Sequence, residues 1–206
     1  MRGPGTAFAS SLAATRDRGN APRDFVWVVG KNRTTGALTG MGLWSGDETA
    51  DFAVIDGQTG AIVQRTYFGA VNLRVGAIPR TSDLNQRSVA VRCSQISPAA
   101  QQIVRGLDAR LARVEIHSVD LDLVSRLPVG PAEVEFLGVV NGAPIETPAA
   151  GAEGGIEMDV VSDAIAMLAR TNFRKRSDET QKARSGDRFS RYGSVIRSWP
   201  VVWGGE

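Results

Sequence analysis

A repeated alternation of apolar and polar residues is the feature that most constrains the fold of this chain. Val89, Val91 and Cys93 alternate with a face that carries Arg92. Because successive side chains of a β-strand point to opposite faces, such a segment buries one face and exposes the other. The same period recurs at 71–75, 114–116, 134–136 and 156–160. Short alternating strands separated by turns predict a mainly β fold, an antiparallel β-barrel or sandwich, rather than an α/β fold.

Two hairpins are expected before most of these strands. Segment 25–29 is rich in β-branched and aromatic residues, and after a turn it is followed by the apolar stretch 38–44. A second hairpin is predicted for 52–55 and 61–63, because Asp-Gly after the first of these segments favours a turn.

One or two short helices interrupt the strands. The first is predicted for 98–105, with Ser97 as its N-cap, a proline at its first position and Gly106 at its end. A second is predicted for 162–169. Segment 141–155 is crowded with Gly, Ala and Pro, so we expect a loop there.

The chain is expected to have three parts. Residues 1–24 form an N-terminal arm with a marginal helix, since a short isolated helix is weak without a partner surface. Residues 25–170 form the antiparallel β-barrel domain. Residues 171–206 form an aromatic C-terminal docking segment.

The amino-acid composition excludes several classes of function. Hydrophobic residues are 42% and charged residues 22% of the 206, and the formal net charge is only +2, so no strong global field attracts nucleic acid. Cys93 is the only cysteine, which excludes an internal disulfide and any metal site with several thiolates; we expect a small buried side chain. No apolar run is long enough for a transmembrane helix, and no secretory signal is evident, so we expect folding in a cytoplasm.

The sequence offers no catalytic signature. His117, the only histidine, follows an alternating segment on its polar side, which predicts an exposed side chain without a catalytic role. Acid pairs spaced by two residues are expected on the solvated face of the sheet. These pairs are Asp120 and Asp122, Glu133 and Glu135, and Glu157 and Asp159. No glycine-rich phosphate-binding motif joins a strand to a helix. We therefore expect a protein that is not an enzyme and holds no cofactor or metal.

The C-terminal segment is unusually aromatic for a chain terminus. Large aromatic side chains carry much of the burial energy of cores and interfaces, so this segment is expected to dock on a surface. The candidate contacts are Arg188, Phe189, Tyr192, Trp199 and Trp203. Arginines and lysines over 170–191 also allow nucleic-acid binding, but the acidic residues among them make it the less favoured interpretation.

Several segments of this chain resemble one family. They are the hairpin pieces 27–29 and 42–46, the run 67–75, the strand 89–97 that leads into the helix at Pro98, the segment 106–110 before 114–117, and the aromatic C-terminus. With them, residues 25–204 resemble the baseplate hub or tail-tip proteins of long-tailed, siphovirus-like bacteriophages and of alphaproteobacterial gene-transfer-agent-like particles. Larger hub relatives carry a cysteine cluster for an iron–sulfur centre, which a chain with Cys93 alone lacks.

The resemblance implies a structural role in a virion. It implies a β-barrel hub that assembles with itself into a ring, a trimer or a hexamer, at the tail tip after synthesis in the host cytoplasm. Such a ring would connect the tail tube or distal tail protein to a central tail fibre protein. Two alternatives stay open: a tail enzyme that degrades the cell envelope, and a nucleic-acid-binding module that uses 170–191.

Overall fold

The computed structural model describes residues 6–80, 85–146, 154–164 and 177–193, together with residues 195, 198 and 204. The chain divides into two compact units, Met1–Met167 and Leu168–Glu206.

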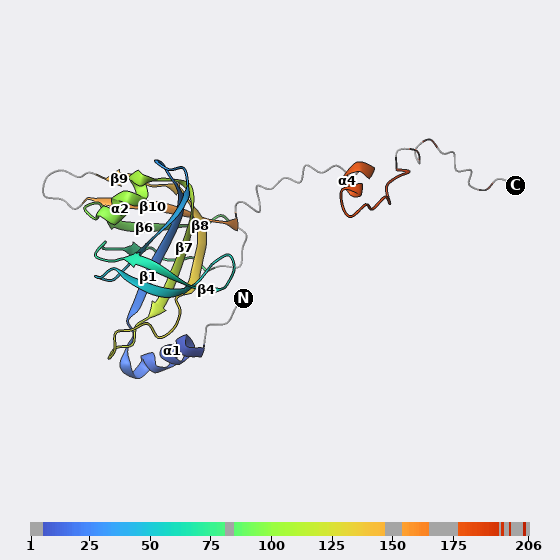
Figure 1. Cartoon of the computed structure of the whole chain (residues 1–206). Helices are drawn as coiled ribbons and strands as arrows, with labels where there is room; N and C mark the ends of the chain where they lie inside the picture. The colour runs from blue at the N-terminus through green and yellow to red at the C-terminus, as the bar shows by residue number, and fades with distance from the viewer. Residues whose placement is uncertain are drawn as a thin grey trace. The chain divides into compact units, whose positions relative to one another are not determined.

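Unit 1 is mainly β and consists of one curled sheet that forms a half-barrel (Figure 1). The predicted fold class is thereby confirmed. The sheet runs in the order β3-β4-β2-β1-β7-β8-β10-β6-β5, and β9 pairs with β10. The strands are β1 Pro22–Asn32, β2 Leu38–Trp44, β3 Ala50–Ile55, β4 Ile62–Phe68, β5 Arg74–Val75, β6 Ser88–Ser94, β7 Leu107–Asp120, β8 Glu133–Gly142, β9 Ile145–Glu146 and β10 Gly155–Ser162.

Nearly all strand pairs are antiparallel, as the alternating pattern predicts. Both expected hairpins are present, β1 with β2 and β3 with β4. The exception is β4, which pairs in parallel with β2 through Tyr67 and Phe68. The β3–β4 hairpin is therefore attached to the sheet by a short parallel contact, and other interactions must hold its free edge.

The central strands β1 and β7 bury side chains on both faces. On β1, Val26 and Val28 belong to the larger apolar core, whereas Phe25 belongs to a smaller core rich in aromatic residues. On β7, Ile116 faces the larger core and Val119 the smaller one. The curl of the sheet thus encloses one core on each side of the β1–β7 pair.

The smaller core is built from ring contacts around Phe25. Its ring stacks on Trp44 at a centroid distance of 5.7 Å and meets the edges of Phe52 and Tyr67 at 4.9 and 5.1 Å. Each such pair adds about 0.5–1.5 kcal/mol beyond the area it buries. We call this group the aromatic core.

The outer edge of β3, at one end of the sheet, is covered by the segment just before β8. The N–H of Ile55 donates to the carbonyl of Ala132 at 2.9 Å, and the N–H of Ala132 donates to the carbonyl of Ala53 at 2.9 Å. At the other end of the sheet, β5 has only two residues. A covered edge and a very short edge both limit strand-to-strand aggregation.

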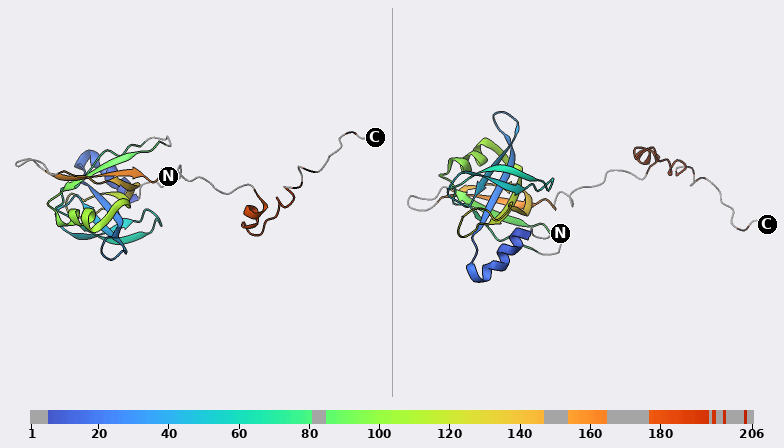
Figure 2. Two further views of the ribbon diagram at one scale, coloured as in Figure 1. Left: turned by 90° about the horizontal axis from the view of Figure 1, so that it is seen from above. Right: turned by 60° about the horizontal axis from the view of Figure 1, so that its bottom comes forward.

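The helices differ in detail from those expected. Helix α1, Thr6–Arg18, is present in the N-terminal arm (Figure 2). The hydroxyl of its Ser11 donates to the carboxylate of Asp120 on β7 at 3.4 Å. Helix α2, Pro98–Gln101, ends early and continues as a π-helical turn, η1, Gln102–Gly106. The wider turn places Ile103 in the larger core immediately before Leu107 begins β7.

The predictions for Ser97, for the loop 141–155 and for the helix 162–169 have different outcomes. Ser97 occupies the N-cap position, as predicted, but its side chain makes no capping hydrogen bond. The expected loop 141–155 contains the end of β8 and all of β9, because both pair with β10. Most of the helix predicted for 162–169 lies outside the described residues.

Within unit 2, one short helix is described, α4, Asp178–Lys182. The hydroxyl oxygen of Ser177 accepts a hydrogen bond from the N–H of Thr180, which is the geometry of an N-cap. Two acidic residues in its first turn and Lys182 in its last turn suit the helix dipole.

Candidate functional site

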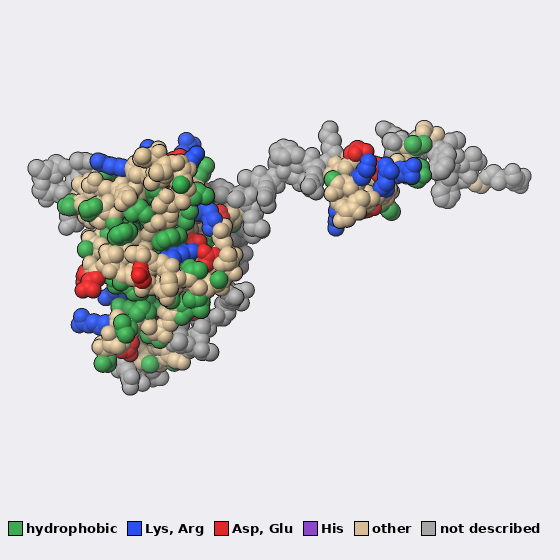
Figure 3. All heavy atoms as spheres, viewed as in Figure 1, with side chains coloured by type: hydrophobic (Ala, Val, Ile, Leu, Met, Phe, Trp, Pro, Cys, Tyr) green, Lys and Arg blue, Asp and Glu red, His purple; other side chains and the backbone are tan. Residues whose placement is uncertain are grey.

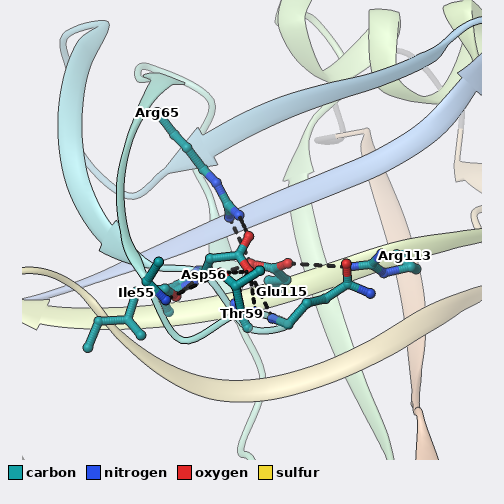
Figure 4. Close-up of polar contacts among 10 residues, drawn as sticks. Ile55, Asp56, Thr59, Arg65, Arg113 and Glu115 are labelled. Atoms are coloured by element: carbon teal, nitrogen blue, oxygen red, sulfur yellow. Dashed lines mark hydrogen bonds and ion pairs between the residues drawn. The ribbon is translucent and has the colours of Figure 1, made fainter.

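A cluster of charged side chains lies beside the aromatic core and joins the β3–β4 hairpin to β7. Figure 4 shows Arg65 of β4 pointing between Asp56 and Glu115. Its two terminal nitrogens lie 2.6 Å from Asp56 Oδ2 and 2.7 Å from Glu115 Oε2. Only 3% of the Glu115 side chain and 10% of the Arg65 side chain are exposed. We call Asp56, Arg65, Glu115 and His117 the buried ionic cluster.

The turn between β3 and β4 is shaped by this cluster. Asp56 Oδ1 accepts hydrogen bonds from the N–H groups of Gln58 and Thr59, and the Thr59 bond is the main reason that the pKa of Asp56 lies below its usual 3.8. The N–H of Gly57 donates to Glu115 Oε2 at 3.2 Å. A Cβ at position 57 would require the end of the Leu137 side chain to shift.

His117 is fully buried, so the prediction of an exposed histidine is wrong. Its Nε2 lies 3.0 Å from the carbonyl oxygen of Ile55 and 3.5 Å from Glu115 Oε2. A carbonyl can only accept, so Nε2 carries the proton and Nδ1 has none when the ring is neutral. Burial lowers the pKa of His117 below its ordinary 6.5. The prediction failed because the polar side of β7 faces the aromatic core instead of solvent.

His117 Nδ1 has no hydrogen-bond partner among the described residues. The hydroxyl of Tyr67 has no partner at standard hydrogen-bond geometry, but the Arg65 guanidinium lies near enough to act against the rise of its pKa. Burial raises the pKa of Tyr67 to about 12, which keeps its hydroxyl protonated at neutral pH. The Arg65 guanidinium also lies over the ring of Trp27, 4.8 Å from its centroid. The cluster thus lies against the edge of the aromatic core, and its contacts hold the hairpin against β7.

The carboxylates of the predicted acid pairs differ in burial and in their partners. Asp120 is buried and accepts from Ser11, so its assignment to a solvated face is wrong; the close packing of α1 and the start of β1 covers it. Glu135 pairs with Arg80, and Glu157 pairs with Arg92 at 2.7 Å. Glu133 and Asp159 are half-buried. Arginine pairing satisfies Glu135 and Glu157 electrostatically.

The predicted cysteine environment is confirmed. Cys93 is buried in the larger core on β6, and burial raises the pKa of its thiol to about 11. A thiol with so high a pKa is protonated at neutral pH and is a poor nucleophile.

The C-terminal contact residues lie partly within the described chain. Phe189 and Tyr192 are 86% and 61% exposed. Arg191 lies over the ring of Tyr192, 5.5 Å from its centroid, and Arg188 pairs with Asp178 at 3.5 Å. Figure 3 shows basic side chains of this unit gathered beside exposed hydrophobic ones. Trp199 and Trp203 lie outside the described residues.

The described residues contain no group of three or more His, Cys, Asp or Glu side chains placed to hold a metal ion. Of the helices described, none is both long and apolar enough to cross a membrane.

The buried ionic cluster was not predicted from the sequence. The usable signal was the spacing of Glu115 and His117 on one strand, which places them on the same face. The role of Arg65 carried no local signal, because its partners come from a turn nine residues earlier and from a strand fifty residues later.

The fold and these sites define a class: a mainly β protein built on one curled sheet, with a C-terminal segment that exposes aromatic and basic side chains. A scan of protein-family models and a search of curated protein sequences gave no match to the chain.

Proposed function

We propose that this chain is a structural protein of a phage tail tip or baseplate, a hub-like subunit that assembles with copies of itself into a ring of three or six. In this role it is not an enzyme and needs no cofactor. The ring connects the tail tube or distal tail protein to a central tail fibre protein in the virion. Support comes from the resemblance of residues 25–204 to hub proteins and from the mainly β fold.

One observation carries the assembly part of this proposal: the exposure of Phe189 and Tyr192. Helix α4 buries none of its residues, so the described part of unit 2 offers these rings little cover. Aromatic and arginine side chains are the residue types that most often dominate protein interfaces. A neighbouring subunit would supply the missing contact surface.

The experiment replaces both rings in the full chain, as Phe189→Ser with Tyr192→Ser. We expect weaker self-association in sedimentation velocity and no incorporation into tailed particles, with the melting temperature unchanged. Ile62→Ser is the matched control, because Ile62 is also exposed but lies on β4. Assembly and incorporation equal to those of the unaltered chain would contradict the proposed docking role.

Nucleic-acid binding is the second candidate, and one observation favours it. Phe189 and Tyr192 are exposed next to Arg188 and Arg191, and single-stranded nucleic acids bind to such pairings of stacking rings and cations. A gel-shift series with single-stranded DNA at low salt tests it. Binding that falls steeply with salt and is lost in Arg188→Ala with Arg191→Ala would support this function, and no shift at low salt would remove it.

A further inference from the structure

We propose that copies of unit 1 contact each other end to end, with a basic end of one copy facing an acidic end of the next. The proposal rests on the self-assembly proposed above and names the surfaces that meet. The basic end is where β1 finishes, and it comprises 31–38 and 105–112. The acidic end is where β1 begins, and it comprises the loop 45–49 and the turn 121–128.

Register places the residues of the basic end together. Lys31 lies opposite both Leu38 of β2 and Asp108 of β7, and the N–H of Arg33 donates to the carbonyl of Gly106 at 2.9 Å. Among the described side chains of this end, the exposed charged ones are four cations and one carboxylate, Asp108. The cations are Lys31, Arg33, Arg105 and Arg110.

Apolar side chains are exposed among these charges. Leu38 is exposed, and Leu111 is 68% exposed within a bulge of β7. The backbone of Leu111 has a φ of 60°, a left-handed conformation that is costly for a leucine. Strain of this kind persists where the surrounding structure enforces it, often at functional sites. Here it holds an apolar side chain in solvent.

Hydrogen bonds bring the two loops of the acidic end to the same place. The N–H of Ser45 donates to the carbonyl of Asp24 at 3.0 Å, and the N–H of Leu121 donates to the carbonyl of Ala21 at 3.0 Å. Asp47 and Glu48 are exposed carboxylates on the loop 45–49, and this loop carries no cation. The turn 121–128 carries one further carboxylate, Asp122, and one cation, Arg126, both exposed.

The turn 121–128 presents apolar side chains in a fixed conformation. Asp122 Oδ1 accepts hydrogen bonds from the N–H groups of Val124 and Ser125, at 3.1 and 2.7 Å. Val124 is 92% exposed, and Leu123 and Leu127 are exposed as well. A turn that is already ordered loses little conformational entropy on binding, which favours its use as a contact.

The two ends are complementary to each other and not to themselves. Opposite net charges attract, whereas two basic ends or two acidic ends would repel, so the charge pattern selects a head-to-tail contact. Such a heterologous contact closes into a ring when the rotation per subunit allows it, and otherwise propagates as a filament. The occupant of each end is therefore the other end of a second copy.

A charge-swap experiment on the full chain tests this contact. The first variant is Lys31→Glu with Arg110→Glu at the basic end, and the second is Asp47→Lys with Glu48→Lys at the acidic end. Arg74→Glu is the control, because it alters an exposed cation on the edge strand β5, outside both ends. Circular dichroism and thermal melting verify that each variant is folded, and sedimentation velocity measures association.

We expect each swapped variant alone to associate about tenfold or more weakly than the unaltered chain, while an equal mixture of the two regains association. The control should associate normally. Unchanged association of both variants, or a mixture that fails to regain it, would overturn the proposal, and so would a monomeric unaltered chain. The charge swaps could leave association unchanged while Phe189→Ser with Tyr192→Ser still abolishes assembly. That result would overturn the end-to-end contact and leave the proposed function standing.

Discussion

At the scale of single residues, Glu115 links β7 to β4 and to the turn that precedes β4. Its carboxylate pairs with Arg65, accepts the N–H of Gly57 and lies 3.6 Å from Arg113. Two unit charges taken out of water lose solvation that only close pairing and further hydrogen bonds restore. The cluster therefore stabilises the position of the β3–β4 hairpin as long as every partner is present.

Removing one charge of this cluster should be costly. We expect Glu115→Gln to lower the free energy of unfolding by about 3 kcal/mol, because Arg65 would keep a buried charge with a weakened set of partners. Urea denaturation measures the change. Glu157→Gln is the matched control: its partner Arg92 is largely exposed, so the loss should stay below about 1 kcal/mol. Equal losses in the two variants would contradict the role given to the cluster.

The buried histidine should make stability depend on pH. In the unfolded chain His117 gains a proton as the pH falls through about 6.5, whereas burial keeps the folded-state pKa lower. The unfolded state then binds more protons, so stability is lost as the pH falls below about 6.5. His117→Gln, whose amide can still donate to Ile55, should show a smaller loss between pH 7 and 5. A slope identical to that of the unaltered chain would exclude His117 as its source.

At the scale of elements, β1 and β7 show how far the sequence pattern reaches. Alternation of Val114 and Ile116 with polar residues predicted a strand with one solvated face, and the strand is there. The second face is buried because the β3–β4 hairpin folds over it, a contact between distant segments that no local pattern encodes. The unbroken apolar run 25–29 was the better signal, since strands buried on both faces read as continuous hydrophobic segments.

The bulge in β7 offers a test at the same scale. Leu111→Asn should raise the free energy of unfolding by about 0.5–1 kcal/mol, because asparagine tolerates the left-handed backbone better than leucine does. The same change should weaken end-to-end association, since it removes an exposed apolar side chain. Leu38→Asn controls for the loss of an exposed leucine where φ is not positive, and it should give no gain in stability. A gain in stability without any loss of association would show that the backbone strain at Leu111 does not serve the proposed contact.

At the scale of the whole molecule, the mainly β fold and the two hairpins follow from residue periodicity and turn chemistry. The division of the interior into two cores does not, because it depends on how the sheet curls and on which segments meet. The aromatic composition of the C-terminus predicted a contact segment, and Phe189 and Tyr192 are exposed within it. In the proposed assembly these rings would contact another molecule, whose surface the sequence of this one chain does not contain.

Locating the chain on purified tailed particles tests its proposed place at the tail tip most directly. Electron microscopy of particles that carry a gold-labelled tag on this chain, produced in the host strain that contains its gene, would show the position. We expect label at the tail tip, in a ring around the tail axis. Particles with intact tails and no label, while the tagged protein remains free in the lysate, would contradict it.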